Sequence, residues 1–237
     1  MKIRAVIQAG GRGTRLMPYT LVLPKPIMPV GESPVIEILL KWLRRNGITD
    51  VNMTIGYLGA LIRTFCGDGS TWDMKIEYYE EKEPLGTVGS LPMMPRKFDD
   101  TFLVLNGDVI TDVNLRKMKE FHKEKSCPLT VAVTTKKVHV DLGVIDAADS
   151  IITKFREKPV LEFCVSMGIY IMEPTILEYI PKGIAFGFDD LVHALMAENR
   201  PIAVFNHDGY WMDIGRPDDF RMVQEEYETH KNKILGV

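Results

Sequence analysis

The sequence predicts an α/β fold with a Rossmann-like central sheet that is mixed but mainly parallel and is flanked by helices. From residue 3 to residue 135, short apolar runs that suit buried strands alternate with segments of helical periodicity, which is typical of crossover units on a parallel sheet. Beyond residue 136 the alternation stops and strand-like runs follow one another directly. A chain of 237 residues can bury one large core, so we expect a single domain over 1–237, with halves at 1–135 and 136–237.

The first half is expected to alternate strands and helices. The predicted strands cover residues 3–9, 51–55, 74–79, 101–105 and 129–135, and the predicted helices cover 33–47, 60–66, 86–94 and 114–125. In the first helix, Ser33 and Pro34 suit an N-cap and a first helical position, and Gly47 suits the end. Apolar residues recur at helical spacing between these two signals.

The second half is expected to begin with strands and end with helices. The predicted strands are 142–147, 151–156, 164–172 and 202–205, and the predicted helices are 174–180, 188–198 and 217–229. Because the first three strands are joined by short connections, they predict a mixed sheet in this half.

A glycine-rich loop follows the first strand. Gly10, Gly11 and Gly13 let the backbone approach a ligand closely, and their N–H groups can converge on an anion. Arg12 and Arg15 add positive charge that suits bidentate contacts with phosphate. The loop therefore predicts binding of a polyphosphate.

Two familiar glycine loops do not fit this segment. The P-loop pattern G-x-x-x-x-G-K-[ST] is absent, and G-x-G-x-x-G fails because Leu16 stands at its last glycine. The pattern that is present, Gly-Gly-x-Gly-Thr-Arg-Leu followed by Pro24-Lys25-Pro26 and Pro29-Val30, resembles the signature of the sugar-1-phosphate nucleotidylyltransferases. These pyrophosphorylases make nucleotide sugars, and the resemblance implies their nucleotide-diphospho-sugar transferase type of fold.

Further segments extend the resemblance over nearly the whole chain. They are Pro-Leu-Gly-Thr at 84–87, Asn-Gly-Asp at 106–108, Glu-Lys-Pro at 157–159 with Gly-Ile-Tyr at 168–170, and Trp-x-Asp-x-Gly at 211–215. Residues 80–89 are most similar to short, single-domain guanylyltransferases that use mannose- or heptose-type 1-phosphates. The chain departs from the family pattern at Gln8, where Leu is usual, and at 165–168.

The resemblance implies a role for each matching residue. The nucleotide-binding residues would be Ala9, Gly10, Gly11, Gly13, Thr14, Glu80 and Gly86, and the sugar-phosphate-binding residues would be Glu157, Lys158 and Gly168. Asp108 and Asp213 would hold Mg²⁺, the implied cofactor, and the catalytic residues would be Lys25, Arg15 and Asp108. Residues 1–135 then form a nucleotide-binding half and residues 136–237 a sugar-phosphate-binding half.

The implied reaction is attack by a sugar 1-phosphate on the α-phosphorus of a nucleoside triphosphate, with release of pyrophosphate. Two anions must meet, so catalysis depends mainly on charge neutralisation and in-line positioning. Lys25 would stabilise the α-phosphate and Arg15 the leaving β- and γ-phosphates. The nucleophile is already ionised at neutral pH, so no general base is needed.

The residues leave two questions open. Glu80, Glu81 or Glu83 could accept hydrogen bonds from guanine, which favours GTP, but UTP, CTP and dTTP together carry equal weight. A catalytically silent paralogue that binds nucleotide sugars is the alternative to an enzyme. Such a paralogue would be expected to lose the catalytic lysine or the metal-binding carboxylates, but Lys25, Asp108, Lys158 and Asp213 are all present, which favours the enzyme.

Composition narrows the partners and the compartment. A net charge of −3 argues against broad nucleic-acid binding. The resemblance implies a nucleoside triphosphate and a sugar 1-phosphate as partners, with a homodimer as an assembly to test. The three cysteines have wide, irregular spacing that suggests neither disulfides nor zinc. There is no signal-peptide pattern and no apolar run near the roughly 20 residues of a membrane span. We expect a cytoplasmic protein.

Overall fold

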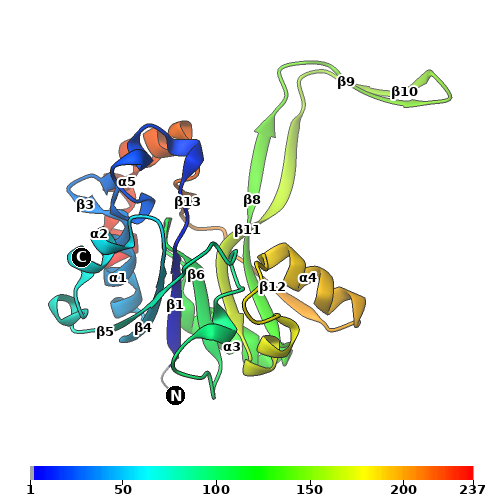
Figure 1. The fold of residues 1–237 in the computed structure, drawn as a ribbon. Helices are drawn as coiled ribbons and strands as arrows, with labels where there is room; N and C mark the ends of the chain where they lie inside the picture. The colour runs from blue at the N-terminus through cyan, green and yellow to red at the C-terminus, as the bar shows by residue number, and fades with distance from the viewer. Residues whose placement is uncertain (1–2, 237) are drawn as a thin grey trace.

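A seven-stranded sheet forms the centre of the molecule (Figure 1) in the computed structural model, which describes residues 3–236. Its strand order is β12-β8-β11-β6-β1-β4-β5. Strand β11 runs antiparallel to both of its neighbours, whereas the other adjacent strands are parallel. The sheet is therefore mixed but mainly parallel, as the sequence predicts.

The elements follow the predicted order with small shifts at their ends. The strands of the central sheet are β1 (Arg4–Ala9), β4 (Asp50–Ile55), β5 (Lys75–Glu80), β6 (Phe102–Asn106), β8 (Leu129–His139), β11 (Val160–Met172) and β12 (Ile202–Asn206). Two-stranded pairs are formed by β2 (Pro29–Val30) with β3 (Ser33–Pro34), β7 (Val109–Thr111) with β13 (Trp211–Asp213), and β9 (Val144–Ala148) with β10 (Ile151–Arg156). The helices are α1 (Val35–Arg45), α2 (Gly59–Cys66), α3 (Leu115–Lys125), α4 (Phe188–Ala197) and α5 (Pro217–Leu235).

Each face of the sheet packs against its own apolar core. On one face, α1, α2 and α5 bury a cluster that includes Ile7 and Trp42. On the other face, α4 and the loop before β6 bury Val6 and Leu191. Side chains alternate between the two faces of a strand, so Gln8 projects toward the same face as Val6, at the point where β1 ends.

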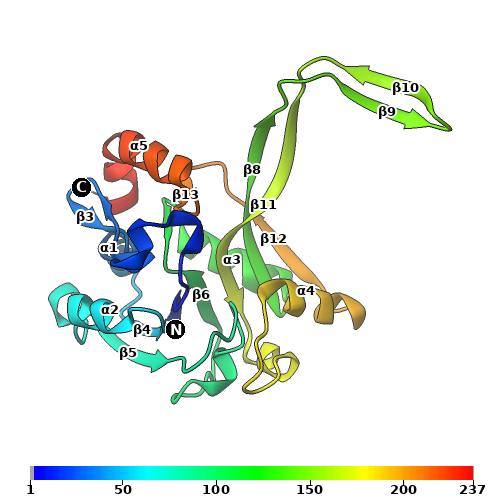
Figure 2. The same ribbon diagram turned by 45° about the horizontal axis from the view of Figure 1, so that its top comes forward.

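Strands β8 and β11 extend beyond the sheet as a long ribbon that bends into β9 and β10 (Figures 1 and 2). We call residues 136–163 the arm. Apolar side chains on it are exposed, among them Leu142 at 75%, Ile151 at 69% and Phe155 at 58%. A two-stranded ribbon buries little surface by itself, so these apolar side chains remain open to solvent in the single chain.

The predicted helix at 86–94 does not form. Only a 3₁₀ turn at Leu91–Met93 remains, because the N–H groups of Val88 and Gly89 both donate to the carbonyl of Phe186. These contacts come from a segment nearly 100 residues away in the chain, so local sequence does not reveal them. The segment becomes a loop that packs on the end of the sheet.

Three other predictions are corrected: the type of one helix, the start of another and the pairing of two strands. Residues 174–180 form a 3₁₀ helix, Pro174–Tyr179, and not an α-helix. Ser33 and Pro34 pair with Pro29–Val30 before α1 begins. The strands predicted at 142–147 and 151–156 pair only with each other, on the arm, and do not join the central sheet. Between residues 3 and 236, every helix is too short or too polar to cross a membrane.

Candidate active site

A cleft of about 380 Å³ opens at the carboxyl ends of β1 and β6, the edge at which open α/β sheets bind ligands. It is lined by Gln8, Ala9, Gly10, Gly11, Gly13, Thr14, Arg15, Lys25, Pro26, Glu81, Pro84, Gly86, Thr87, Asn106, Gly107 and Asp108. The cleft thus brings the glycine loop together with the 84–87 and 106–108 segments. Of the predicted site residues, Glu80, Glu157, Lys158, Gly168 and Asp213 are not among those that line it.

The glycine loop is shaped by two local constraints. Gly13 has a φ of +61°, a conformation that glycine adopts without steric cost, and its carbonyl accepts a 2.9 Å hydrogen bond from the Thr20 hydroxyl. At Gly10, a Cβ would lie 2.7 Å from Oε2 of Glu81. Glycine at this position therefore lets the Glu81 carboxylate pack directly against the loop.

Lys25 lies between two carboxylates. Its ammonium group forms an ion pair with Asp108 and lies 3.5 Å from Oδ1 of Asp213. Asp213 reaches this position because β13 pairs with β7, which places it opposite Val109. Burial, and then the negative charge of Asp108, raises the pKa of Asp213 to about 6. The cluster concentrates opposite charges in a partly buried site.

The two aspartates suit a magnesium ion. The Oδ1 atoms of both Asp108 and Asp213 are buried and accept no hydrogen bond, although buried polar atoms are usually paired. Mg²⁺ commonly binds one or two carboxylates and takes its other ligands from water and substrate phosphates. Within residues 3–236 no cluster of three or more His, Cys, Asp or Glu side chains could hold a metal. Phosphate and water oxygens would therefore complete the coordination.

Arg15 lines the cleft on the side that borders Asp213. It belongs to a short 3₁₀ turn, Thr14–Leu16, whose last residue is fully buried and anchors the turn. Gly215 lies beside both Arg15 and Asp213, since a Cβ built there would be 3.5 Å from the arginine Nη2 and 3.4 Å from the aspartate Oδ1. The guanidinium is thus positioned near the carboxylates, at the more exposed end of the site.

Within the acidic cluster, Glu81 takes the position predicted for Glu80. Glu80 is exposed at the end of β5 and lies 3.4 Å from Arg63 in an ion pair. The N–H of Glu81 donates to the carbonyl of Ile55 at 2.8 Å, and its side chain lies over Gly10. Its Oε1 atom is buried without a partner, and burial raises the pKa of Glu81. Alternation along the strand separates the two glutamates onto different faces.

Gly168 lies just behind the cleft wall. A Cβ on it would be 2.9 Å from Cγ of Asn106, and Asn106 lines the cleft. Next to it, Trp211 donates its indole N–H to the carbonyl of Met167 at 2.9 Å. This bond ties β13 to β11, so the second half of the chain borders the site through Gly168 and Asp213.

A model of the nucleotidyl transferase family matches residues 4–230. The chain belongs to this family. It is 33% identical to a UTP–glucose-1-phosphate uridylyltransferase of Synechocystis sp. over 92% of its own length, and 34% identical to a mannose-1-phosphate guanyltransferase of Debaryomyces hansenii over 98%. The chain spans 61% and 66% of the lengths of these two relatives.

Solved structures share the fold. A putative glucose-1-phosphate thymidylyltransferase from Bacillus anthracis matches with a TM-score of 0.76 and 22% identity, covering 94% of each chain. HddC from Yersinia pseudotuberculosis matches with a TM-score of 0.75 and 24% identity, covering 95% of this chain and 99% of that one. At these identities the likeness establishes the nucleotidyl transferase fold and nothing finer.

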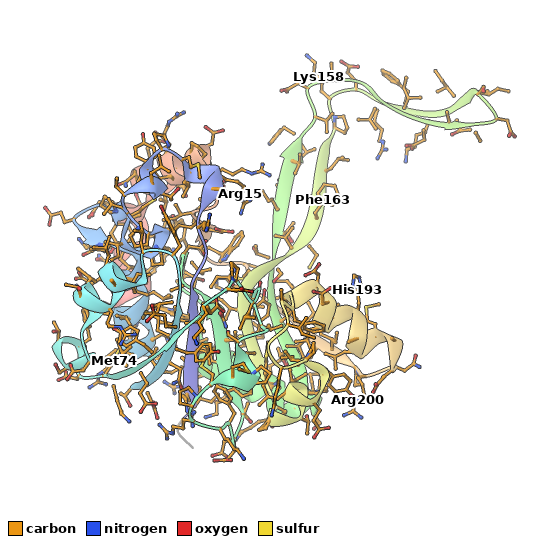
Figure 3. The ribbon with its side chains drawn as sticks, in the orientation of Figure 1. Arg15, Met74, Lys158, Phe163, His193 and Arg200 are labelled. Carbon is orange, nitrogen blue, oxygen red and sulfur yellow. The ribbon has the colours of Figure 1, made fainter. Side chains whose placement is uncertain are left out.

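Glu157 and Lys158 lie on the arm and not in the cleft. Figure 3 shows Lys158 at the bend of the arm, well away from Arg15. Glu157 lies near Gly143, whose Cβ would be 3.4 Å from the glutamate Oε2. The structure therefore does not bring this part of the predicted site together within one chain, because β8 and β11 run outward before they reach these residues.

Several residues that line the cleft were not assigned a role from the sequence. They are Gln8, Pro26, Pro84, Thr87, Asn106 and Gly107. All but Gln8 belong to the segments that carry the resemblance, and the signal at Gln8 was its departure from the family pattern, but nothing in the sequence said where its side chain would point.

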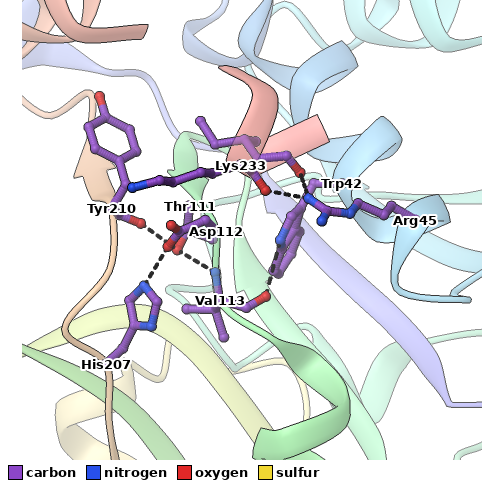
Figure 4. A network of polar contacts seen from close by, with 9 residues as sticks. Trp42, Arg45, Thr111, Asp112, Val113, His207, Tyr210 and Lys233 are labelled. Atoms are coloured by element: carbon purple, nitrogen blue, oxygen red, sulfur yellow. Dashed lines mark hydrogen bonds and ion pairs between the residues drawn. The ribbon is translucent and has the colours of Figure 1, made fainter. Parts of the chain in front are cut away.

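Asp112, which follows Asp108 in the chain, is committed to contacts that support the local structure. Its Oδ1 lies 2.8 Å from Nε2 of His207, and its backbone N–H donates to the carbonyl of Tyr210 (Figure 4). The neighbouring Thr111 hydroxyl donates to the same carbonyl at 3.0 Å. These bonds hold the chain that leads into β13 against β7, and so fix where Asp213 lies.

Proposed function

We propose that the chain transfers a nucleoside monophosphate from a nucleoside triphosphate to a sugar 1-phosphate, giving a nucleotide-diphosphate sugar and pyrophosphate. The observation that carries this proposal is the position of Lys25 between Asp108 and Asp213 beside the glycine loop. The cleft and its border thus combine the Lys25 cation, two carboxylates and a glycine loop of the kind that lets backbone N–H groups approach an anion. Joining two phosphate anions requires these features.

Each cation in the cleft has a part in the transfer. The glycine loop would hold the triphosphate through its N–H groups, and Arg15 would contact the β- and γ-phosphates that leave. Lys25 would lie against the α-phosphate and stabilise the charge that grows there as the sugar phosphate oxygen attacks. Because the ion pair with Asp108 already holds the ammonium in the cleft, little reorganisation is needed when substrate binds.

Mg²⁺ is the cofactor that we propose. Asp108 and Asp213 would hold it through the oxygens that accept no hydrogen bond. When bound, the ion would neutralise charge on the phosphate oxygens.

GTP is the triphosphate that we favour. Glu81 lines the cleft with a buried, unpartnered oxygen, and guanine is the base whose Watson–Crick edge offers two adjacent donors, N1–H and N2–H₂, to one carboxylate. Several relatives are named mannose-1-phosphate guanyltransferases, which supports GTP and a mannose-type 1-phosphate; a heptose-type 1-phosphate is the other acceptor that we propose to test. UTP, CTP and dTTP are the alternatives.

The acceptor would bind in the half formed by residues 136–237, opposite the nucleotide-binding half at 1–135. Glu157 and Lys158 remain our proposed sugar-phosphate ligands, and this role requires the arm to fold over a cleft. A homodimer would let the arm of one copy cover the partner, and the exposed Leu142, Ile151 and Phe155 support such an assembly. Light scattering after size exclusion tests it: Phe155→Ser with Ile151→Ser should shift the mass toward a monomer.

A pyrophosphate-release assay with a panel of triphosphates and sugar 1-phosphates tests the reaction. The expected result is Mg²⁺-dependent release that requires both substrates. Tight nucleotide-sugar binding without any release would favour the silent paralogue. We propose a cytoplasmic location because Cys66, Cys127 and Cys164 are all free thiols, and we propose neither a nucleic-acid nor a membrane partner.

A further inference from the structure

Gln8 occupies the floor of the cleft at the end of β1. It lines the cleft together with Glu81 and Thr87, on the sheet face that carries Val6. Its amide nitrogen Nε2 is buried and has no hydrogen-bond partner. A buried donor without a partner costs about 1–3 kcal/mol, so its position at a ligand cleft calls for a ligand acceptor.

The orientation of the Gln8 amide is fixed from behind. The hydroxyl of Thr54, on the neighbouring strand β4, donates to Oε1 of Gln8 at 2.6 Å. The same hydroxyl oxygen accepts the backbone N–H of Ala9 at 3.4 Å. With Oε1 engaged by the threonine, Nε2 is the atom left for a ligand.

Two residues that line the same cleft therefore carry an unpartnered donor and an unpartnered acceptor. Gln8 contributes an unpartnered N–H₂ group, and Glu81 contributes an unpartnered carboxylate oxygen. A ligand edge that satisfies both must carry a carbonyl next to an N–H. Guanine and uracil or thymine have this edge, whereas adenine and cytosine place an amino group next to a bare ring nitrogen.

We propose that Gln8 is a specificity-determining residue that donates from Nε2 to the base carbonyl, and that with Glu81 it selects oxo bases over amino bases. The proposal rests on the proposed function, since it assigns the nucleobase to this end of the cleft. An amino base would set its N–H₂ group against the Gln8 donor and leave Glu81 without a hydrogen to accept. Leaving such groups unpaired is how a polar pocket rejects a wrong ligand.

Equilibrium binding of GTP, UTP, ATP and CTP, measured by calorimetry with Mg²⁺, tests the proposal without relying on turnover. Wild-type protein should bind the better of GTP and UTP more tightly than ATP or CTP by a factor on the order of 10 to 100. Gln8→Leu should lower this ratio roughly 10-fold. Gln224→Leu, the same change on the outer helix α5 and outside the cleft lining, is the matched control and should leave the ratio unchanged.

Thr54→Val keeps the shape of the buried threonine but removes the hydroxyl that orients the amide. It should lower the ratio by less than Gln8→Leu, and its own melting temperature shows whether it folds. The proposal is overturned if folded Gln8→Leu keeps the wild-type ratio of oxo-base to amino-base affinity, or if the wild-type protein prefers ATP or CTP. If wild-type protein selects oxo bases in binding but releases no pyrophosphate with any acceptor, the proposed function fails and the role of Gln8 stands.

Discussion

The two halves of the chain present their proposed binding residues in different ways. In the first half, Lys25, Asp108 and the glycine loop meet because adjacent parallel strands end at one edge of a sheet whose two faces are buried. In the second half, Glu157 and Lys158 lie on a ribbon that leaves the body (Figures 1 and 2). The first set is preorganised by the core, and the second depends on the position of the arm.

This difference predicts two kinds of contribution to the proposed reaction. A preorganised charge lowers the barrier without reorganisation during the reaction. Residues on an extended arm can act only after the arm is covered or folded over, so their effect should appear in substrate binding first. The predictions below test this contrast, in order of decreasing effect.

Lys25→Ala should give the largest loss. Removing a preorganised charge from a developing anion typically costs about 10²–10³-fold in rate, so kcat should fall by this factor while the KM for the triphosphate changes little. The measurement is steady-state pyrophosphate release. The control is Lys41→Ala, which removes an exposed lysine paired with Glu37 on α1. If Lys25→Ala kept a near-normal kcat, Lys25 would have no part in the chemical step.

Asp108→Asn and Asp213→Asn should each weaken magnesium binding. Removing an outer-sphere partner of a metal typically lowers metal affinity roughly 10- to 100-fold, and the loss of affinity here should be at least as large. The measurement is the Mg²⁺ concentration that gives the half-maximal rate. EDTA should abolish activity. Asp73→Asn, at a carboxylate that is 85% exposed in the turn before β5, is the control and should leave that midpoint unchanged. Identical Mg²⁺ titrations for all the proteins would remove the two aspartates from the metal site.

Lys158→Ala should raise the KM for the sugar 1-phosphate by roughly 10-fold, the value of a charge-assisted hydrogen bond, and leave triphosphate binding unaltered. This outcome would show that the arm reaches a cleft during turnover. Lys154→Ala, another exposed lysine of the arm on β10, controls for general loss of charge. Equal KM values for both variants and the wild type would mean that the arm takes no part in binding the acceptor.

Glu81→Gln should have the smallest effect, and it concerns stability. Burial raises the pKa of Glu81, so the folded state favours its protonated form. The stability that this form provides is fully present below the unfolded pKa, near 4.5, and is lost as pH rises through the folded pKa. Removing the charge should therefore raise Tm by a few degrees at pH 8 and leave it unchanged at pH 4. Glu80→Gln, at an exposed position, should change neither value, and a lower Tm for Glu81→Gln at pH 8 would contradict this account.

The sequence by itself determined the class of fold and most of the segments that line the cleft. Alternating strands and helices require a mainly parallel sheet, and in such a sheet the carboxyl ends of neighbouring strands share one edge. Loops that follow β1 and β6, at Gly10 and Asp108, therefore had to meet. The phosphate-binding chemistry expected of these loops could be read from the sequence alone, because it depends on the spacing of the glycines and on the charged residues next to them.

Tertiary structure decided what depends on contacts between distant segments. The helix expected at 86–94 gave way to hydrogen bonds with Phe186, and Glu81 replaced Glu80 because the end of β5 sets which side chain turns inward. The arm left the sheet although its strands were correctly expected, since periodicity marks a strand but not its partner. Gln8 became a candidate for base selection only when Thr54, from a neighbouring strand, was found to hold its amide.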